Sequence, residues 1–392
     1  QEYIENELFI DLQEKGPFKF WKHSHLFLPQ KKPKTVLEDV IEYRMPFYRA
    51  SDPIMRQLVN PKLTRVFRFR HKRTNNDLHL HTKYKTDPLK IAITGASGLI
   101  GSMLKAFLTA GGHEVFPLVR GETSSNNEIA WDPHAGYVEK KKLEGMDAII
   151  HLAGKNIASG RWNKQVKQEI RQSRVISTQF LSDTLASLNK PPSVFLSASA
   201  TGFYGDAGID PVEENSSAGS SFLAQVCQEW ETATQSAAEA GIRVVNMRLG
   251  MVLTAQGGAL STMLTPFRLG VAGVVGHGKQ MMSWIALDDL LGAMYHLIHR
   301  ENIHGPVNMV SPMAVSNWEF TKTLGLVLRR PTLFPLPALA VKTMLGEMGR
   351  ELLLYGVNAT PTKLQKTEYA FLFPRLESAL RFELGKFAKG EE

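Results

Sequence analysis

The sequence predicts an α/β fold: a doubly wound parallel sheet with a small C-terminal module, preceded by an α+β segment. From Leu89 onward, short apolar runs rich in β-branched residues alternate with helical patterns. This alternation is typical of a parallel sheet covered by helices on both faces. The first run, Lys90 to Thr94, enters a glycine-rich turn that leads at once into a helical pattern, which favours the same fold class.

The turn after the first strand predicts a dinucleotide-binding site of the Rossmann type. Its glycines stand at Gly95, Gly98 and Gly101. The first glycine permits a tight turn, the second lets the backbone approach a pyrophosphate, and the third lets helix and strand pack closely. The phosphates then lie on free N–H groups at the helix N-terminus. The alternative is a glycine turn with a purely structural role.

The alternation continues to about residue 250. Further strands are expected at 114–119, 148–152, 194–197 and 244–247, and helices at 165–188 and 222–240. Ligands of such sheets bind outside the carboxyl ends of the strands. The second strand ends at Arg120, where an acidic residue would favour NAD and an arginine suits a 2′-phosphate. Because guanidinium binds phosphate bidentately, NADP(H) is the predicted cofactor; alternatively Arg120 merely lies in solvent.

Length and composition set the domain organisation. The 392 residues suffice for two or three domains, and we expect a partial domain with a linker at 1–88, a nucleotide-binding domain at 89–310 and a small module at 311–392. The single cysteine, Cys227, excludes internal disulfides and predicts a reducing, cytoplasmic location. No apolar run approaches the ~20 residues that cross a bilayer, so no transmembrane segment is expected. The oligomeric state is left open.

The region 1–88 is the most basic part of the chain. Strand-like runs at 8–12, 18–27 and 36–45 precede a helical pattern that ends in the basic run Arg65 to Arg73, and a polar linker follows. Basic side chains favour a helix C-terminus and usually form a solvated face, so no nucleic-acid partner is predicted.

Two His-x-His pairs occur in the same region, at 23–25 and 79–81. This spacing places both imidazoles of a pair on one face of a strand and can bind a metal ion. No carboxylate or cysteine completes a ligand set in the sequence pattern, so we expect exposed strand histidines and no metal site.

Several short segments between residue 89 and about residue 384 carry a family resemblance; they are 94–101, 151–154, 161–162, 173–174, 197–205, 222–227, 229–231, 248–253, 283–289, 357–364 and 373–380. In these segments the chain resembles the extended, atypical short-chain dehydrogenase/reductase superfamily, in the epimerase-like branch that includes sugar-nucleotide epimerases and cell-division-inhibitor-like proteins. The region 1–88 is similar to the last strands and long helix of a helix-grip, polyketide-cyclase-like domain.

The resemblance implies cofactor contacts along the strand ends. The pyrophosphate, 2′-phosphate, adenosine and nicotinamide would be held in turn by Gly95, Ser97, Gly98, Leu99, Ile100, Gly101, Arg120, Leu152, Ala153, Gly154, Ser197, Ala198, Arg248, Gly250 and Val252. Apolar and basic side chains suggest a wall for a small-molecule substrate, although such residues often simply pack; they are Arg161, Trp162, Met282 and Trp284.

The usual Tyr-x-x-x-Lys pair of this superfamily is missing. No lysine lies between Lys190 and Lys279, and aligning the helix puts Phe222 and Val226 at the positions of the pair. Ser199 and Tyr204 are the hydroxyls expected near the nicotinamide, as catalytic groups or as parts of a turn. The predicted function is therefore an NADP(H)-dependent oxidoreductase or epimerase acting on a small polar carbonyl or hydroxyl compound; the alternative is a catalytically silent NADP(H) sensor or scaffold.

Overall fold

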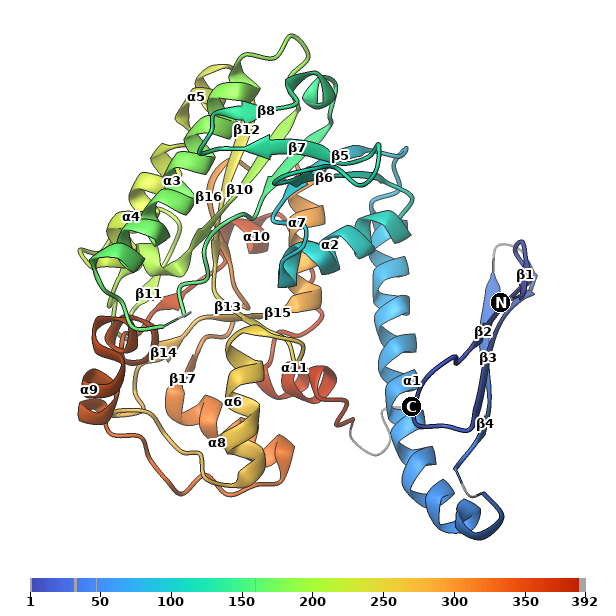
Figure 1. The fold of residues 1–392 in the computed structure, drawn as a ribbon. Coiled ribbons are helices and arrows are strands. Elements are labelled where there is room, and N and C mark those ends of the chain that lie inside the picture. Colours follow the sequence, from blue (N-terminus) through green and yellow to red (C-terminus); the bar gives the residue numbers. More distant parts are fainter. Residues whose placement is uncertain (1, 32–33, 47, 159, 388–392) are drawn as a thin grey trace. The chain divides into compact units, whose positions relative to one another are not determined.

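The computed structural model describes residues 2–31, 34–46, 48–158 and 160–387, and these form two compact units. The units are Gln1–His71 and Lys72–Glu392. A domain boundary was expected at 88/89, whereas the units divide inside the long helix α1 (Tyr48–Lys83) (Figure 1). The reason is that the last turns of α1 belong to the core of the second unit, where Leu80 and Tyr84 are buried.

The first unit is an antiparallel sheet followed by a helix, the α+β arrangement expected. Its strands are ordered β1-β2-β3-β4 and span Glu2–Ile4, Leu8–Leu12, Phe20–Pro29 and Thr35–Arg44. Within this unit the helix packs on the sheet, since the Phe67 ring meets the His23 ring edge-on at 5.1 Å.

Two expectations for this region were wrong. The basic run does not end the helix, because α1 continues to Lys83. Two of its basic side chains also form ion pairs, Arg70 with Asp39 and Arg73 with the buried Asp288. His79 and His81 therefore lie on a helix, while His23 and His25 are buried on β3. A helix places residues i and i+2 on different faces, so His79 and His81 do not share a face. His23 and His25, on a strand, do share one.

The second unit contains an eight-stranded sheet in the order β16-β12-β10-β9-β5-β6-β7-β8. All neighbours pair in parallel except β7 and β8. The strands are β5 (Lys90–Thr94), β6 (Glu114–Val119), β7 (Ile129–Asp132), β8 (Tyr137–Val138), β9 (Ala148–His151), β10 (Val194–Ala200), β12 (Arg243–Leu249) and β16 (Gly305–Met309). This is the predicted doubly wound sheet, and its order reverses between β5 and β9.

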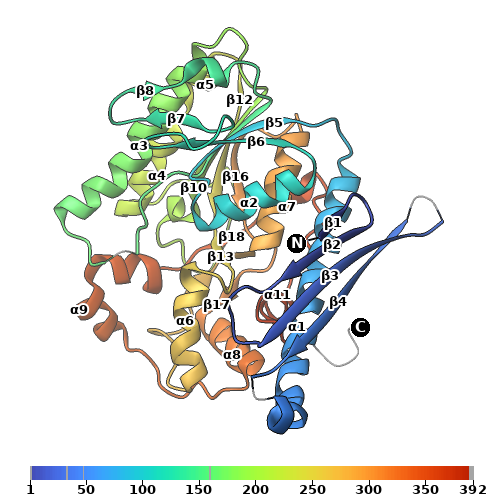
Figure 2. The same ribbon diagram turned by 45° about the vertical axis from the view of Figure 1, so that its right-hand side comes forward.

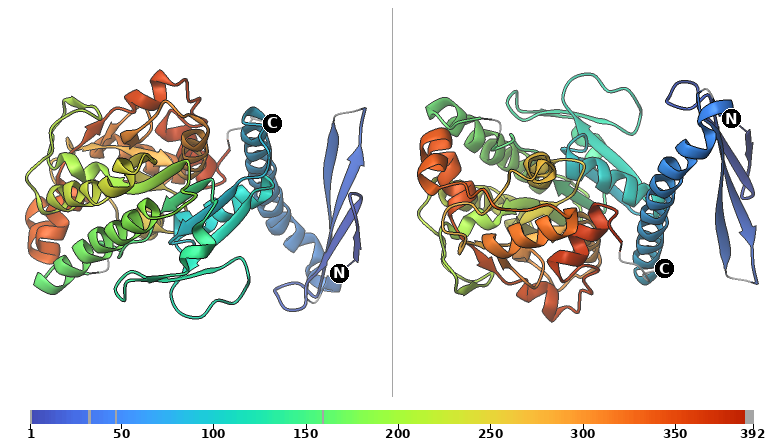
Figure 3. Two further views of the ribbon diagram at one scale, coloured as in Figure 1. Left: turned by 90° about the horizontal axis from the view of Figure 1, so that it is seen from above. Right: turned by 90° about the horizontal axis from the view of Figure 1, so that it is seen from below.

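Helices cover both faces of this sheet, as seen from above and below in Figure 3. On one face Ile91 and Ile93 of β5 pack against α2 (Leu99–Ala110) and α7 (Leu287–His299). On the other face Ala92 packs in the cluster that contains α3 (Lys164–Ala186) and α5 (Gln235–Glu239). Alternate residues of one strand thus serve two cores, which is why the strands read as continuous apolar runs.

Three further elements lie elsewhere: η1 (Lys140–Leu143) follows β8, α4 (Phe222–Thr232) packs against α3 and β10, and α10 (Thr362–Lys366) packs against β16. Most other elements of the second unit lie toward the carboxyl ends of the strands, below the sheet in Figure 2. They are η2 (Thr201–Tyr204), β11 (Pro211–Val212), β13 (Met251–Leu253), α6 (Gly258–Leu269), β14 (Met281–Met282), β15 (Trp284–Ala286), β17 (Val315–Ser316), α8 (Asn317–Leu328), α9 (Ala338–Gly349), the π-helical turn η3 (Arg350–Leu354), β18 (Asn358–Ala359) and α11 (Leu376–Glu383). The Asp289 carboxylate binds the segment that precedes α11, since it accepts hydrogen bonds from the N–H groups of Leu372 (2.7 Å) and Phe373 (2.9 Å).

No helix of the described residues combines the length and the apolar character needed to cross a membrane.

Candidate functional site

The turn between β5 and α2, residues 95–101, has the geometry of an anion-binding turn and is called the glycine turn below. Gly95 has φ +69°, a conformation that side chains disfavour, and its carbonyl accepts a hydrogen bond from the Gly98 N–H at 2.9 Å. Gly98 is extended (φ −74°, ψ 172°) and immediately precedes α2. The free N–H groups of the first helical turn therefore follow directly on Gly98.

The other two glycines of the turn, Gly98 and Gly101, lie close to neighbouring backbone atoms. A Cβ on Gly101 would lie 2.2 Å from the Gly95 carbonyl oxygen, so helix and strand could not pack as they do. A Cβ on Gly98 would lie 3.2 Å from the same oxygen, and apart from the chain neighbours of Gly98 no other heavy atom of the described residues would lie within 4 Å. The position beside Gly98 is thus open on its outer side. This arrangement fits a pyrophosphate.

The segment after β9 lies beside the glycine turn, at the point where the strand order reverses. Thr94 Oγ1 accepts hydrogen bonds from the N–H groups of Leu152 (3.1 Å) and Ala153 (3.2 Å) and bonds to His151 Nδ1 at 2.7 Å. Burial lowers the pKa of His151 to about 3, so this imidazole is neutral and serves the structure. Crevices at such a reversal are the usual ligand sites of doubly wound sheets.

The structure brings the predicted cofactor residues to this edge of the sheet. Ser97 is exposed in the glycine turn, and Arg120 is exposed directly after β6, the strand that neighbours β5. Ser197 and Ala198 are buried in β10, and Gly250 and Val252 connect β12 to β13 and enter it.

The two hydroxyls predicted as catalytic belong to one buried network. Ser199 Oγ donates to Glu231 Oε1 at 2.7 Å, and Arg248 holds both oxygens of Glu231 at 2.8 Å. Arg248 Nη1 also donates to Tyr204 Oη at 3.0 Å, and the Tyr204 hydroxyl donates to Asn308 Oδ1 at 2.7 Å. We call these five residues the hydroxyl network.

A cation lies beside Tyr204, the guanidinium of Arg248, which comes from a strand far along the chain. Burial nevertheless raises the pKa of Tyr204, and Arg248 offsets only part of this effect. The phenol therefore keeps its proton at neutral pH and acts as a donor. Burial also raises the pKa of the neighbouring Cys227 to about 12, so this thiol packs rather than reacts.

A polar pocket of about 480 Å³ opens next to Tyr204, between the start of α4 and η3. Basic and acidic groups line it together: Lys167 on α3, Arg350 and Glu351 on η3, and Glu347 on α9. Lys167 Nζ pairs with Glu347 Oε1 at 2.9 Å and lies 4.3 Å from the centre of the Phe222 ring. An ammonium group thus stands beside one of the positions where the superfamily pair would be.

The predicted substrate wall does not line this pocket. Trp284 is fully buried and donates its indole N–H to the Met313 carbonyl, so it belongs to the core. Trp162 is buried against the Phe222 ring, at 5.3 Å between ring centres, and thereby supports the pocket from behind. Arg161 approaches Gly346, and the half-buried Met282 pairs with β17.

Sequence reasoning missed Glu231, Asn308, Lys167 and Arg350. Glu231 and Asn308 were invisible because their partners are distant along the chain, at separations of 17 to 104 residues. A carboxylate two positions after Glu229 on an otherwise apolar helix face was the one available signal for Glu231.

Comparisons with known proteins agree with this geometry. Residues 91–309 match the model of the NAD dependent epimerase/dehydratase family, and residues 336–383 match a domain of unknown function, DUF1731. The chain is 41% identical over 292 residues to the Epimerase family protein Mb2239 of Mycobacterium bovis, covering 74% of this chain and 96% of that protein.

Two solved structures are also similar. A nucleoside-diphosphate sugar epimerase from Corynebacterium glutamicum aligns with TM-score 0.79 and 33% identity, covering 98% of this chain and 75% of that chain. The human epimerase family protein SDR39U1, solved with NADPH, aligns with TM-score 0.69 and 32% identity, covering 75% of this chain and 98% of that chain.

Proposed function

Because the chain belongs to the NAD dependent epimerase/dehydratase family, we propose that it binds NADP(H) and oxidises, reduces or epimerises a small polar carbonyl or hydroxyl compound. The observation that carries the proposal is the glycine turn, where only hydrogen fits at Gly101 and the outer side of Gly98 is open. The human relative solved with NADPH and the exposed Arg120 after β6 support a 2′-phosphorylated cofactor.

Separate groups of residues would bind the cofactor and the substrate. N–H groups at the start of α2 bind the pyrophosphate, and the Arg120 guanidinium binds the 2′-phosphate. NADP(H) supplies hydride chemistry when bound. The polar pocket beside Tyr204 holds the substrate, since it offers both cations (Lys167, Arg350) and carboxylates (Glu347, Glu351) as partners. A polar substrate with many hydroxyl groups suits this mixed lining, and a nucleotide sugar, named for the corynebacterial relative, is such a compound.

Tyr204 is the proposed catalytic group. Tyr204 lines the pocket, and its hydroxyl keeps its proton, so we expect it to donate to a substrate oxygen in place of Asn308. Arg248, 3.0 Å from Tyr204 Oη, would stabilise the negative charge that forms there when the proton leaves. Ser199 acts through Glu231, which it helps to hold against Arg248.

One observation favours the alternative, a silent NADP(H) sensor or scaffold. Val226 is buried and Phe222 is apolar at the positions of the superfamily's pair, so neither can move a proton. The two functions share the cofactor and differ in turnover. The cytoplasmic location inferred from the single cysteine stays a prediction.

Cofactor titration of a Gly98→Val variant tests the proposal. A branched side chain would occupy the open side of Gly98, so NADPH binding followed by nicotinamide fluorescence should be lost. The extended backbone of Gly98 admits a side chain, so circular dichroism and the melting temperature should stay close to those of the parent. Gly98→Ala, with a single methyl group, is the graded control and should bind with intermediate affinity. A folded Gly98→Val chain with parent-level NADPH affinity would refute the site.

A further inference from the structure

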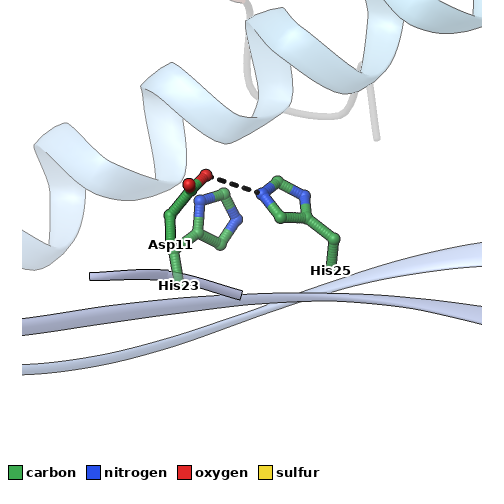
Figure 4. Close-up of side chains that lie close together, drawn as sticks. All are labelled: Asp11, His23 and His25. Atoms are coloured by element: carbon green, nitrogen blue, oxygen red, sulfur yellow. Dashed lines mark ion pairs between the residues drawn. The ribbon is translucent and has the colours of Figure 1, made fainter. Parts of the chain in front are cut away.

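We propose that Asp11, His23 and His25 in the first unit bind a divalent transition-metal ion, with Zn²⁺ as the expected occupant. This histidine cluster lies within Gln1–His71 and shares no residue with the proposed cofactor and substrate sites. Figure 4 shows the two rings and the carboxylate turned toward one another on the helix side of the sheet. The prediction that these two histidines are exposed and lack a carboxylate was wrong, because both are buried and Asp11 lies beside them.

Strand geometry brings the three groups together. His23 and His25 are two residues apart on β3 and point to the same face. Asp11 on β2 stands directly opposite His23 in the antiparallel register. The carboxylate is thus supplied by the neighbouring strand, which a local sequence pattern cannot reveal.

The distances suit one ion. The candidate ligand atoms of the three residues all lie within 4.8 Å of one another, and His25 Nε2 is 3.6 Å from Asp11 Oδ2. Two ligands in a tetrahedral zinc site, each ~2.0–2.1 Å from the metal, lie about 3.3 Å apart. If His25 Nε2 and Asp11 Oδ2 moved closer by a few tenths of an ångström, both could bind the same ion. At 3.6 Å the same two atoms are too far apart for a good hydrogen bond.

Asp39 is placed to orient both imidazoles. Its side chain is 2% exposed, and its Oδ1 lies 2.8 Å from His23 Nε2 and 2.8 Å from His25 Nδ1. When one nitrogen of a neutral imidazole donates to a carboxylate, the other carries the lone pair that a metal needs. Carboxylates behind metal-binding histidines commonly act in this way. Asp39 is accordingly a positioning residue.

Two basic side chains of α1 reach the same carboxylate, since Arg70 Nη1 lies 3.4 Å and His71 Nε2 lies 2.6 Å from Asp39. Arg70 Nη2 also lies 3.1 Å from His25 Nδ1. An ion on His25 Nε2 would leave the ring proton on Nδ1, which would then donate to Asp39 rather than accept from Arg70.

Two imidazoles and one carboxylate leave at least one position for water or a substrate. Such a set is typical of catalytic zinc sites, and the same donors also bind Fe²⁺ and Co²⁺. The Asp11 side chain is 44% exposed, which gives an ion a route from solvent.

Metal titration of the full chain, free of any histidine tag and treated with a chelator, tests the proposal. Zn²⁺ competed against a chromophoric chelator should bind at one equivalent per chain, and Co²⁺ should give the visible absorption of a four- or five-coordinate site. Asp11→Asn and His25→Gln should each weaken Zn²⁺ binding at least 100-fold. Asp39→Asn should weaken it about 10- to 100-fold, the usual effect of removing an orienting carboxylate.

A matched control is His79→Gln, an exposed histidine on α1 that should leave the zinc affinity unchanged. Asp11→Asn changes a partly exposed side chain, so it keeps the test valid if the buried His25 variant fails to fold. Absence of stoichiometric Zn²⁺ binding would overturn the proposal, as would full affinity in Asp11→Asn. NADPH affinity, measured in the same samples, should not respond to zinc, so failure of either proposal is separate from the other.

Discussion

The glycine turn and the hydroxyl network lie at the same edge of one sheet, yet they depend on the chain in different ways. The backbone nearest to Gly98 and Gly101 is that of Gly95 and Ala96 in the same turn, and Gly95 itself lies against the backbone of Leu152 and Ala153. The network joins Ser199 and Tyr204 to Glu231, Arg248 and Asn308, and each of these five residues belongs to a different element. Binding at this edge thus rests on local backbone conformation, whereas the groups available for chemistry are held by distant ion pairs and hydrogen bonds.

Removing the carboxylate at the centre of the network should have the largest effect. Glu231→Ala leaves the Arg248 guanidinium buried without its bidentate partner, so stability should fall by about 3–5 kcal/mol in urea unfolding. Glu229→Ala on the same helix removes an exposed pair with Arg171 and should cost at most about 1 kcal/mol. Equal costs in the two variants would mean that the network does not hold this edge together.

Tyr204→Phe should lower kcat by about 10²-fold, the usual effect of losing a proton donor, with NADPH affinity nearly unchanged. Ser199→Ala, which acts only through Glu231, should lower kcat by about 10-fold. NADPH absorbance with a panel of sugar nucleotides, quinones and simple ketones measures both. Turnover that survives Tyr204→Phe would remove Tyr204 from the chemistry. No turnover with any compound would favour the sensor function.

Adding one methyl group should affect Gly101 and Gly98 of the glycine turn differently. Gly101→Ala places a methyl group 2.2 Å from the Gly95 oxygen, so overpacking should cost about 2 kcal/mol of stability. Gly98→Ala, at 3.2 Å, should cost well under half as much and act on NADPH binding instead. Thermal unfolding with and without NADPH separates the two effects. A stable Gly101→Ala chain would show that the turn can widen.

The smallest expected effect concerns cofactor choice. NADPH should bind at least tenfold more tightly than NADH, about 1.4 kcal/mol, and Arg120→Ala should remove most of this difference. NADH affinity is the internal control and should hardly change. Equal affinities for the two cofactors in the parent chain would contradict the role of Arg120.

Features that depend on residues close together in the chain could be predicted from the sequence. Strands β5 and β6 were predicted with their observed ends, because continuous β-branched runs stop at glycine or polar residues. The glycine turn was equally readable, since its requirement is local. The family resemblance, now shown, also came from such contiguous motifs.

The features that could not be predicted depend on contacts between residues that are distant along the chain. Arg248 beside Tyr204, Asp11 opposite His23, and the burial of Trp284 all follow from strand register and core packing. The helix α1 was predicted to end early because its basic run resembled a C-terminus, whereas tertiary contacts of Leu80 and Tyr84 extend it. Propensity at a helix end is easily overridden by such packing.

The burial of Cys227 has a practical consequence. Only a thiolate attacks a labelling reagent, and a thiol that is 3% exposed with a pKa raised to about 12 forms almost none while α4 stays packed. As this is the chain's single cysteine, alkylation of the native protein must pass through a transient opening of the α4 region. The rate of alkylation, relative to that of the unfolded chain, therefore measures the free energy of that opening, without any engineered probe.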